Sequence, residues 1–122
     1  MALLCYNYDM KYVGTIVEEG LKDNRFINHL TVVGVRISSA ENPNHRWHLY
    51  KVEIDEDDID AFANQLKQEK WYMHFWNGDE VIAVFPDKVY KFQHSNKSTW
   101  KDAVEHGLSI GIPEEQLDFI IE

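Results

Sequence analysis

The chain has 122 residues, of which 44% are hydrophobic and 27% are charged, as in an ordinary globular domain. There are 21 acidic and 12 basic residues, which gives a formal net charge of -9. This balance argues against nucleic acid as a partner, because binding a phosphate backbone requires a basic face. The length predicts one domain over residues 1–122, large enough to bury a core without disulfides.

From the N-terminal residues we expect no targeting signal. Residues 1–8 lack the basic region and the length of a signal peptide, and no apolar run approaches the ~20 residues of a membrane span. We therefore expect no membrane partner and a cytoplasmic location. Cys5 is the single cysteine, so an internal disulfide is excluded, and we interpret it as a small packed hydrophobe. We assign no element to residues 1–10.

The first half of the chain predicts strands separated by a short helix. Lys11–Glu18 is rich in β-branched residues, which favours a strand over the rival helix that its apolar spacing would allow. Asp23 is placed to cap a short helix that runs to Leu30. Further strands are expected at Thr31–Ser38 and Arg46–Ile54.

The second half predicts an amphipathic helix followed by a three-stranded meander. Asp55 is expected to cap a helix over Glu56–Glu69, whose apolar residues recur at i, i+3, i+4 and i+7. In Trp71–His94, two alternating apolar runs flank Asn77-Gly78, which is the strongest short-range signal for a hairpin with a type I′ turn. A second turn at Pro86-Asp87 leads into the third run.

The C-terminal part predicts two helices. Ser98 or Thr99 caps a helix that runs to Ile110, and Gly111 follows as its C′ residue. Pro113 is expected at the first position of a last short helix. The order of elements predicts an α+β fold, a ferredoxin-like βαββαβ antiparallel sheet extended by a C-terminal β-hairpin and two helices. Another open α+β sheet is the alternative.

The two turns of the meander decide which side chains share a face. A two-residue Asn77-Gly78 turn sets Phe75 opposite Glu80. A two-residue turn at Pro86-Asp87 would add Tyr90 and Phe92 to the outer face, whereas a three-residue turn would move them to the core face. We favour the three-residue turn, because it gives one consistent apolar face. In either register the outer face of the first strand carries Tyr72, His74 and Trp76.

This outer face, which we call the His74 face, is the candidate ligand-binding site. Cover by the tail helices, an interface with another copy, and a small-molecule pocket are the alternatives, with cover weighted first. For an enzyme, we expect His74 to act as general acid–base, with Glu18, Glu19 or Tyr72 nearby. Glu18 and Glu19 end the first strand beside Gly20, where solvated turn residues are the more ordinary interpretation.

Two other patterns indicate little chemistry. His45 and His48 are three positions apart, which places them on opposite faces of a strand. No Cys pair or HExxH motif accompanies them, so we predict no metal and no cofactor. The acidic run Glu53–Asp60 resembles a calcium loop in composition alone, since Asp60 and Leu66 stand where that loop needs glycine and glutamate.

The stretch STWKDAVEHGLSIGIPEEQLDF, with KWYMHFWNGDEVIAVFPDKVYKF before it and GTIVEEGL near the front, is similar to a family of small uncharacterised prokaryotic proteins. The similarity covers most of the chain but not the residues before Lys11. It implies a compact stand-alone protein, and it transfers no activity and no functional residue. Independently of this similarity, the extra apolar area of the His74 face, which has no convergent acid–base set, leads us to predict a binding or interaction domain. We expect it to form a homodimer or larger homo-oligomer through the meander or an edge strand, or to bind a small molecule. A small-molecule enzyme is the alternative.

Overall fold

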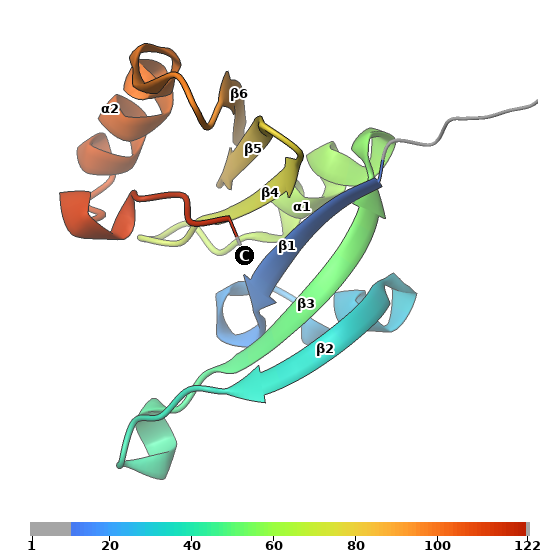
Figure 1. Cartoon of the computed structure of the whole chain (residues 1–122). Helices are drawn as coiled ribbons and strands as arrows, with labels where there is room; N and C mark the ends of the chain where they lie inside the picture. The colour runs from blue at the N-terminus through green and yellow to red at the C-terminus, as the bar shows by residue number, and fades with distance from the viewer. Residues whose placement is uncertain (1–10, 122) are drawn as a thin grey trace, which may run out of the picture.

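A computed structural model describes residues 11–121, which form a six-stranded antiparallel sheet with one α-helix on each face (Figure 1). Cys5 and the rest of residues 1–10 lie outside the described part. The strands are β1 (Lys11–Val17), β2 (Thr31–Ile37), β3 (His48–Asp55), β4 (Met73–Asn77), β5 (Glu80–Phe85) and β6 (Lys88–Gln93), in the spatial order β2-β3-β1-β4-β5-β6. The helices are α1 (Ile59–Gln65) and α2 (Lys101–Ser109), and short 3-10 helices occupy most of the connections. None of the described helices is long and apolar enough to cross a membrane.

The prediction of a ferredoxin-like βαββαβ sheet with an appended hairpin is wrong. Only 3-10 helices lie between β1 and β2, the longer being Asn24–His29, so the first α-helix of that arrangement is missing. Asp23 does cap this segment, because its carboxylate accepts a hydrogen bond from the Arg25 amide at 3.0 Å. Six residues are too few to offset the cost of nucleating an α-helix. In addition, β5 and β6 continue the sheet beyond β4 and form no separate hairpin.

One face of the sheet packs against α1 and the segment before β2. Phe62 of α1 lies at the centre of this first core, edge-on to Phe26 and Phe75 with ring centroids 5.0 Å apart in both pairs. The buried members of the first core are Tyr12, Ile16, Leu21, Val52, Ile54, Ile59, Phe62, Ala63, Leu66, Met73, Phe75, Ile82 and Val84.

The opposite face of β4, β5 and β6 packs against α2 and residues 110–121, which we call the C-terminal segment. Phe119 is fully buried there and has φ 45°, a left-handed conformation that a bulky residue keeps only where packing compensates for the strain. Figure 1 shows that β1, β2 and β3 have no helix over this face. The buried members of the second core are Trp76, Val81, Ala83, Phe85, Phe92, Trp100, Ala103, Ile112, Leu117 and Phe119.

The first turn of the meander is displaced from its predicted position. Asn77 pairs with Glu80, so the turn is Gly78-Asp79, and only Gly78 has a positive φ, at 58°. This is the pattern of a type II′ turn, not of the predicted type I′. The observed register differs by two residues from the predicted one, in which Phe75 opposed Glu80, so every side chain keeps its predicted face.

The second turn contains Pro86-Asp87 alone, so the preferred three-residue turn is wrong. Asp87 has φ 62°, as the third residue of a type II turn requires after a proline. Tyr90 and Phe92 therefore share the face of His74. We preferred the three-residue turn because it placed the apolar side chains on one face. That reason does not hold here, because both faces of this part of the sheet pack against a hydrophobic core.

Two predicted helix caps are wrong, because the side chains have other partners. The Asp55 carboxylate makes no cap and instead pairs with Lys11 Nζ at 2.9 Å. The turn that leads into α2 is capped by Asn96, not by Ser98 or Thr99. The Thr99 hydroxyl instead donates to a main-chain carbonyl.

The remaining helix ends agree more closely with the sequence. Gly111 follows α2 as its C′ residue with φ 93°, as predicted. Pro113 stands one position earlier than expected, as the N-cap of the last 3-10 helix. The helix predicted to reach Glu69 ends at Gln65, because Leu66 is extended and bridges Leu21.

Candidate functional site

The C-terminal segment covers the His74 face. The Tyr72 hydroxyl donates to the Gln116 carbonyl, and His74 Nε2 donates to the Ile120 carbonyl at 2.8 Å. The Phe119 ring stands edge-on to both side chains, with centroids 5.7 Å away in each case. Of the alternatives set out for this face, the described residues show cover by the chain's own C-terminal part.

These contacts limit the chemistry of the His74 face. Burial, followed by the charge of Asp118, raises the pKa of Tyr72 well above its ordinary value, so the phenol stays neutral. Trp76 is only 8% exposed and contacts the His74 ring at a centroid distance of 5.3 Å. One ring nitrogen of His74 is committed to the main chain, which fixes its orientation. The arrangement favours a role for His74 in holding the C-terminal segment.

A groove of about 410 Å³ runs between the C-terminal segment and the uncovered face of the sheet, and we call it the tail groove. Its volume falls within the range of small-molecule sites. The three residues predicted to bind a ligand all line it, namely Tyr72, His74 and Trp76. The half-buried part of its floor comes from β1 and β3, through Thr15, Val17 and Leu49.

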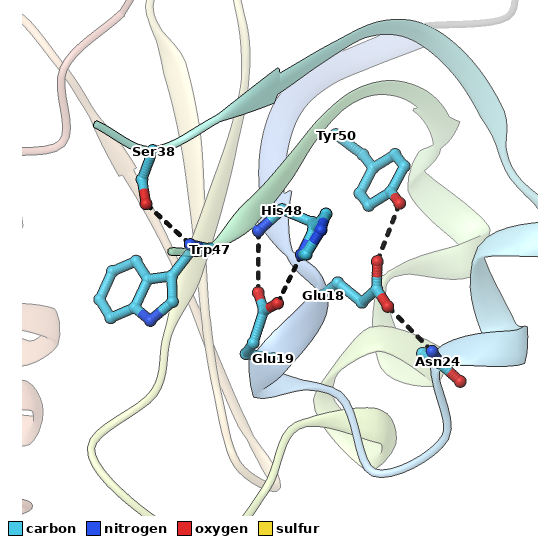
Figure 2. A network of polar contacts seen from close by, with 7 residues as sticks. All are labelled: Glu18, Glu19, Asn24, Ser38, Trp47, His48 and Tyr50. Carbon is cyan, nitrogen blue, oxygen red and sulfur yellow. Dashed lines mark hydrogen bonds and ion pairs between the residues drawn. The ribbon is translucent and has the colours of Figure 1, made fainter. Parts of the chain in front are cut away.

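The two glutamates predicted as catalytic candidates lie elsewhere, where β1 ends beside β3 (Figure 2). Glu19 Oε1 accepts from the His48 amide at 2.9 Å, and Oε2 lies 2.7 Å from His48 Nδ1. The hydrogen bond to Glu19 raises the pKa of His48. Burial acts to raise the pKa of Glu19, but the hydrogen bonds from His48 outweigh it and the net shift is downward. Both shifts favour the ion pair.

Glu18 has partners of its own. Its Oε1 accepts from the Tyr50 hydroxyl at 2.8 Å, and its Oε2 accepts from the Asn24 amide at 2.9 Å (Figure 2). The hydrogen bond to Glu18 raises the pKa of Tyr50, and burial adds to the shift. All four carboxylate oxygens of Glu18 and Glu19 are thus used to join β1 to its neighbours. The structure does not bring these glutamates to His74 as partners.

The same end of the sheet holds two tryptophans in contact, of which Trp47 is exposed and Trp71 is partly buried. Ser38 fixes the start of β3, because the Trp47 amide donates to Ser38 Oγ at 2.7 Å (Figure 2). The Ser38 amide in turn donates to the Trp47 carbonyl at 2.9 Å. The Trp47 ring, 46% exposed, then lies 5.4 Å from the Trp71 ring. Trp71 packs on Gly20, where a Cβ would come within 2.8 Å of the indole.

No metal site is visible in the described part of the chain. His45 is exposed at the end of a 3-10 helix, and His48 is paired with Glu19. Among residues 11–121, no group of three or more His, Cys, Asp or Glu side chains is placed to hold an ion. The acidic run after β3 is used in part for ion pairs, such as that between Glu56 and Lys91.

Sequence reasoning missed His48 and Tyr50 as partners of the two glutamates. Alternation along the strand does place both on one face. The glutamates could not be matched to these partners from the sequence, because the pairing of β1 with β3, which sets Val17 opposite Leu49, was not known.

Comparisons with protein-family models, with curated proteins and with solved structures found no match. The similarity to a family of small prokaryotic proteins stays a prediction. The function therefore has to be inferred from the surfaces that the chain itself presents.

Proposed function

We propose that this chain is an interaction domain that forms a homodimer by pairing β2 with the β2 strand of a second copy. The proposal rests on the free edge of the sheet at β2. Every residue of β2 except Gly34 is exposed, and Val33, Val35 and Ile37 expose 50%, 61% and 47% of their surface. A sheet edge presents unpaired main-chain groups that accept another strand. The cytoplasmic location predicted above belongs to the same proposal.

The two edges of the sheet differ in how they are protected. β6 carries Lys88 and Lys91 as exposed residues, and lysine is a usual guard against edge-to-edge pairing. β2 has a single charge, Arg36, and no carboxylate, although the chain is acidic. A bulge near Val33 distorts the first half of β2, which leaves residues 34–37 as the regular part.

A second copy of the chain fits this edge. A two-fold axis at Val35 would pair the strands antiparallel, with Val35 opposite its own counterpart and Arg36 opposite Gly34. This register buries the valines together and keeps the two arginines apart, and it gives an isologous interface. The face of β2 is free of carboxylates, so the net charge of -9 on each copy opposes association only from a distance.

The sequence alone left the meander or an edge strand as the interface. Within the described residues, α2 and the C-terminal segment cover the outer face of the meander, whereas β2 is open. The alternative of an enzyme with His74 as general acid–base has less support, since Glu18 and Glu19 bind Tyr50 and His48.

The test is the mass of the full chain in solution by sedimentation equilibrium. We expect twice the 14.4 kDa mass of one chain, and we expect Val35→Lys to be monomeric, because a lysine on the edge blocks pairing. Leu108→Lys is the matched control, since it places the same charge on another exposed apolar position, 46% exposed on α2, and should remain dimeric. Thermal melts check that both variants fold. A wild-type chain that stays monomeric at all concentrations, or a dimeric Val35→Lys, contradicts the proposal.

A further inference from the structure

The tail groove has side chains of opposite charge along its length. Arg36 reaches it from β2, Lys70 from the segment before β4, and Glu115 and Asp118 from the C-terminal segment. All four are exposed. None of the ion pairs formed among residues 11–121 includes any of them. The groove therefore holds two cations and two anions that have no partner of opposite charge within the described chain.

The floor between these charges is apolar. Arg36 pairs with Leu49 across β2 and β3, and Leu49 pairs with Val17 across β3 and β1, so the three form one row across the sheet. The C-terminal segment stands beyond this row, along β4, where Tyr72 and His74 hold it. A molecule lying across the row would meet a cation at one side, apolar side chains below, and a carboxylate at the other side.

The aromatic pair forms part of the wall of the groove. Trp47 and Trp71 line the tail groove together with Lys70, and the same three residues line a neighbouring hollow. Trp71 is held in place by its contact with Gly20, so the exposed Trp47 ring rests on a fixed support. Such a supported indole offers an apolar surface to a ligand side chain.

We infer that the tail groove binds a short zwitterionic peptide, with its carboxylate at Arg36, its ammonium group at Asp118 and an apolar side chain against the tryptophan pair. The presence of both cations and anions in the groove favours a zwitterionic ligand over an anion or a cation alone. In a chain of net charge -9 an anion alone is repelled by the overall field, while a cation alone is attracted to many surface carboxylates. A dipeptide carries both charges, separated by a main chain, and a groove of about 410 Å³ has room for one.

The test measures binding of leucyl-leucine to the full chain by titration calorimetry. Two probes of the same shape isolate the charges, N-acetyl-leucyl-leucine without the ammonium group and leucyl-leucine amide without the carboxylate. We expect saturable binding of the free dipeptide and weaker binding of both blocked forms. Arg36→Gln and Asp118→Asn should each weaken binding of the free dipeptide about tenfold or more, because each removes a charge-assisted hydrogen bond.

The pattern across variants and probes separates recognition from a general loss of structure. Arg36→Gln should leave the affinity for the amide unchanged, and Asp118→Asn should leave the affinity for the acetylated form unchanged. Lys101→Gln and Glu105→Gln, at exposed positions of α2, are the matched controls and should bind the free dipeptide as the wild type does. Absence of saturable binding, equal binding of the blocked forms, or folded groove variants that bind as the wild type does would overturn the inference. It is independent of the homodimer, since a monomeric Val35→Lys should bind the dipeptide normally.

Discussion

Both carboxylate oxygens of Glu19 are bound by one residue, His48, through its main-chain amide at 2.9 Å and its ring Nδ1 at 2.7 Å. The contact lies just beyond Val17 and Leu49, the last pair of the β1–β3 ladder. It therefore extends the pairing of the two strands through a side chain. Because both partners titrate, the strength of this junction depends on pH.

We expect the His48–Glu19 pair to stabilise the fold most between about pH 4.3 and about pH 6.5, the ordinary pKa values of Glu and His. The pKa of His48 is raised on folding, so its contribution is complete below the ordinary value and is lost as the pH rises through the raised one. The pKa of Glu19 is lowered, so its contribution is complete above the ordinary value and is lost as the pH falls through the lowered one.

Urea unfolding at a series of pH values measures this effect. The free-energy difference between the wild type and His48→Gln should be largest inside that window and should shrink on both sides. His45→Gln changes a nearby exposed histidine that has no ion pair in the described chain, so it should show no such pH dependence. A difference between wild type and His48→Gln that does not vary with pH would refute the prediction.

Two glycines in the sheet should differ strongly in how much an alanine destabilises the fold. A Cβ at Gly14 would lie 2.4 Å from the His74 carbonyl oxygen and 2.4 Å from a ring carbon of Phe75, and the main chain cannot yield without disturbing the β1–β4 pairing. We expect Gly14→Ala to cost about 3 kcal/mol of unfolding free energy, the upper end of the usual overpacking cost. At Gly34 the nearest atom is 3.7 Å away, so Gly34→Ala should change stability by less than ~0.5 kcal/mol. Equal costs in urea unfolding would show that β1 is not packed this closely.

Phe119 should be the main anchor of the C-terminal segment. Its buried ring contacts Trp100 at a centroid distance of 5.3 Å, and Phe92 at 4.9 Å. We expect Phe119→Ala to lower the unfolding free energy by about 3–5 kcal/mol and to shift tryptophan emission to longer wavelength. Ile120→Ala removes a neighbouring side chain that is 53% exposed and should have little effect on either quantity. A cost below ~1 kcal/mol for Phe119→Ala would show that the segment is held in another way.

The sequence was informative where alternation alone decides the outcome. The faces of β4 and β5 were predicted correctly although the turn was displaced, because a shift of two residues preserves alternation. The third strand was not predictable by the same argument. In β6, Val89 packs against the first core and Phe92 lies in the second. Apolar side chains therefore occur on both faces of β6, and alternation between apolar and polar residues could not tell the core face from the outer face.

The candidate site was less accessible to sequence reasoning than the fold. Glu18 and Glu19 were identified as candidates, but their partners on β3, Tyr50 and His48, lie about thirty residues away along the chain and are brought close by strand pairing. The tail groove depends in the same way on β2 and the C-terminal segment lying on opposite sides of β1 and β3. Arg36 and Asp118 have no local pattern that links them, because the sheet is what relates their positions.

The burial of β5 bears on how the protein loses its structure. Residues 81–85 are fully buried, with Val81, Ala83 and Phe85 in the second core and Ile82 and Val84 in the first. The single strand β5 thus contributes buried side chains to both cores. Because displacement of its main chain on one side disturbs the packing on the other, we expect the two cores to melt together. Segments packed on opposite sides of the sheet consequently unfold as one cooperative unit.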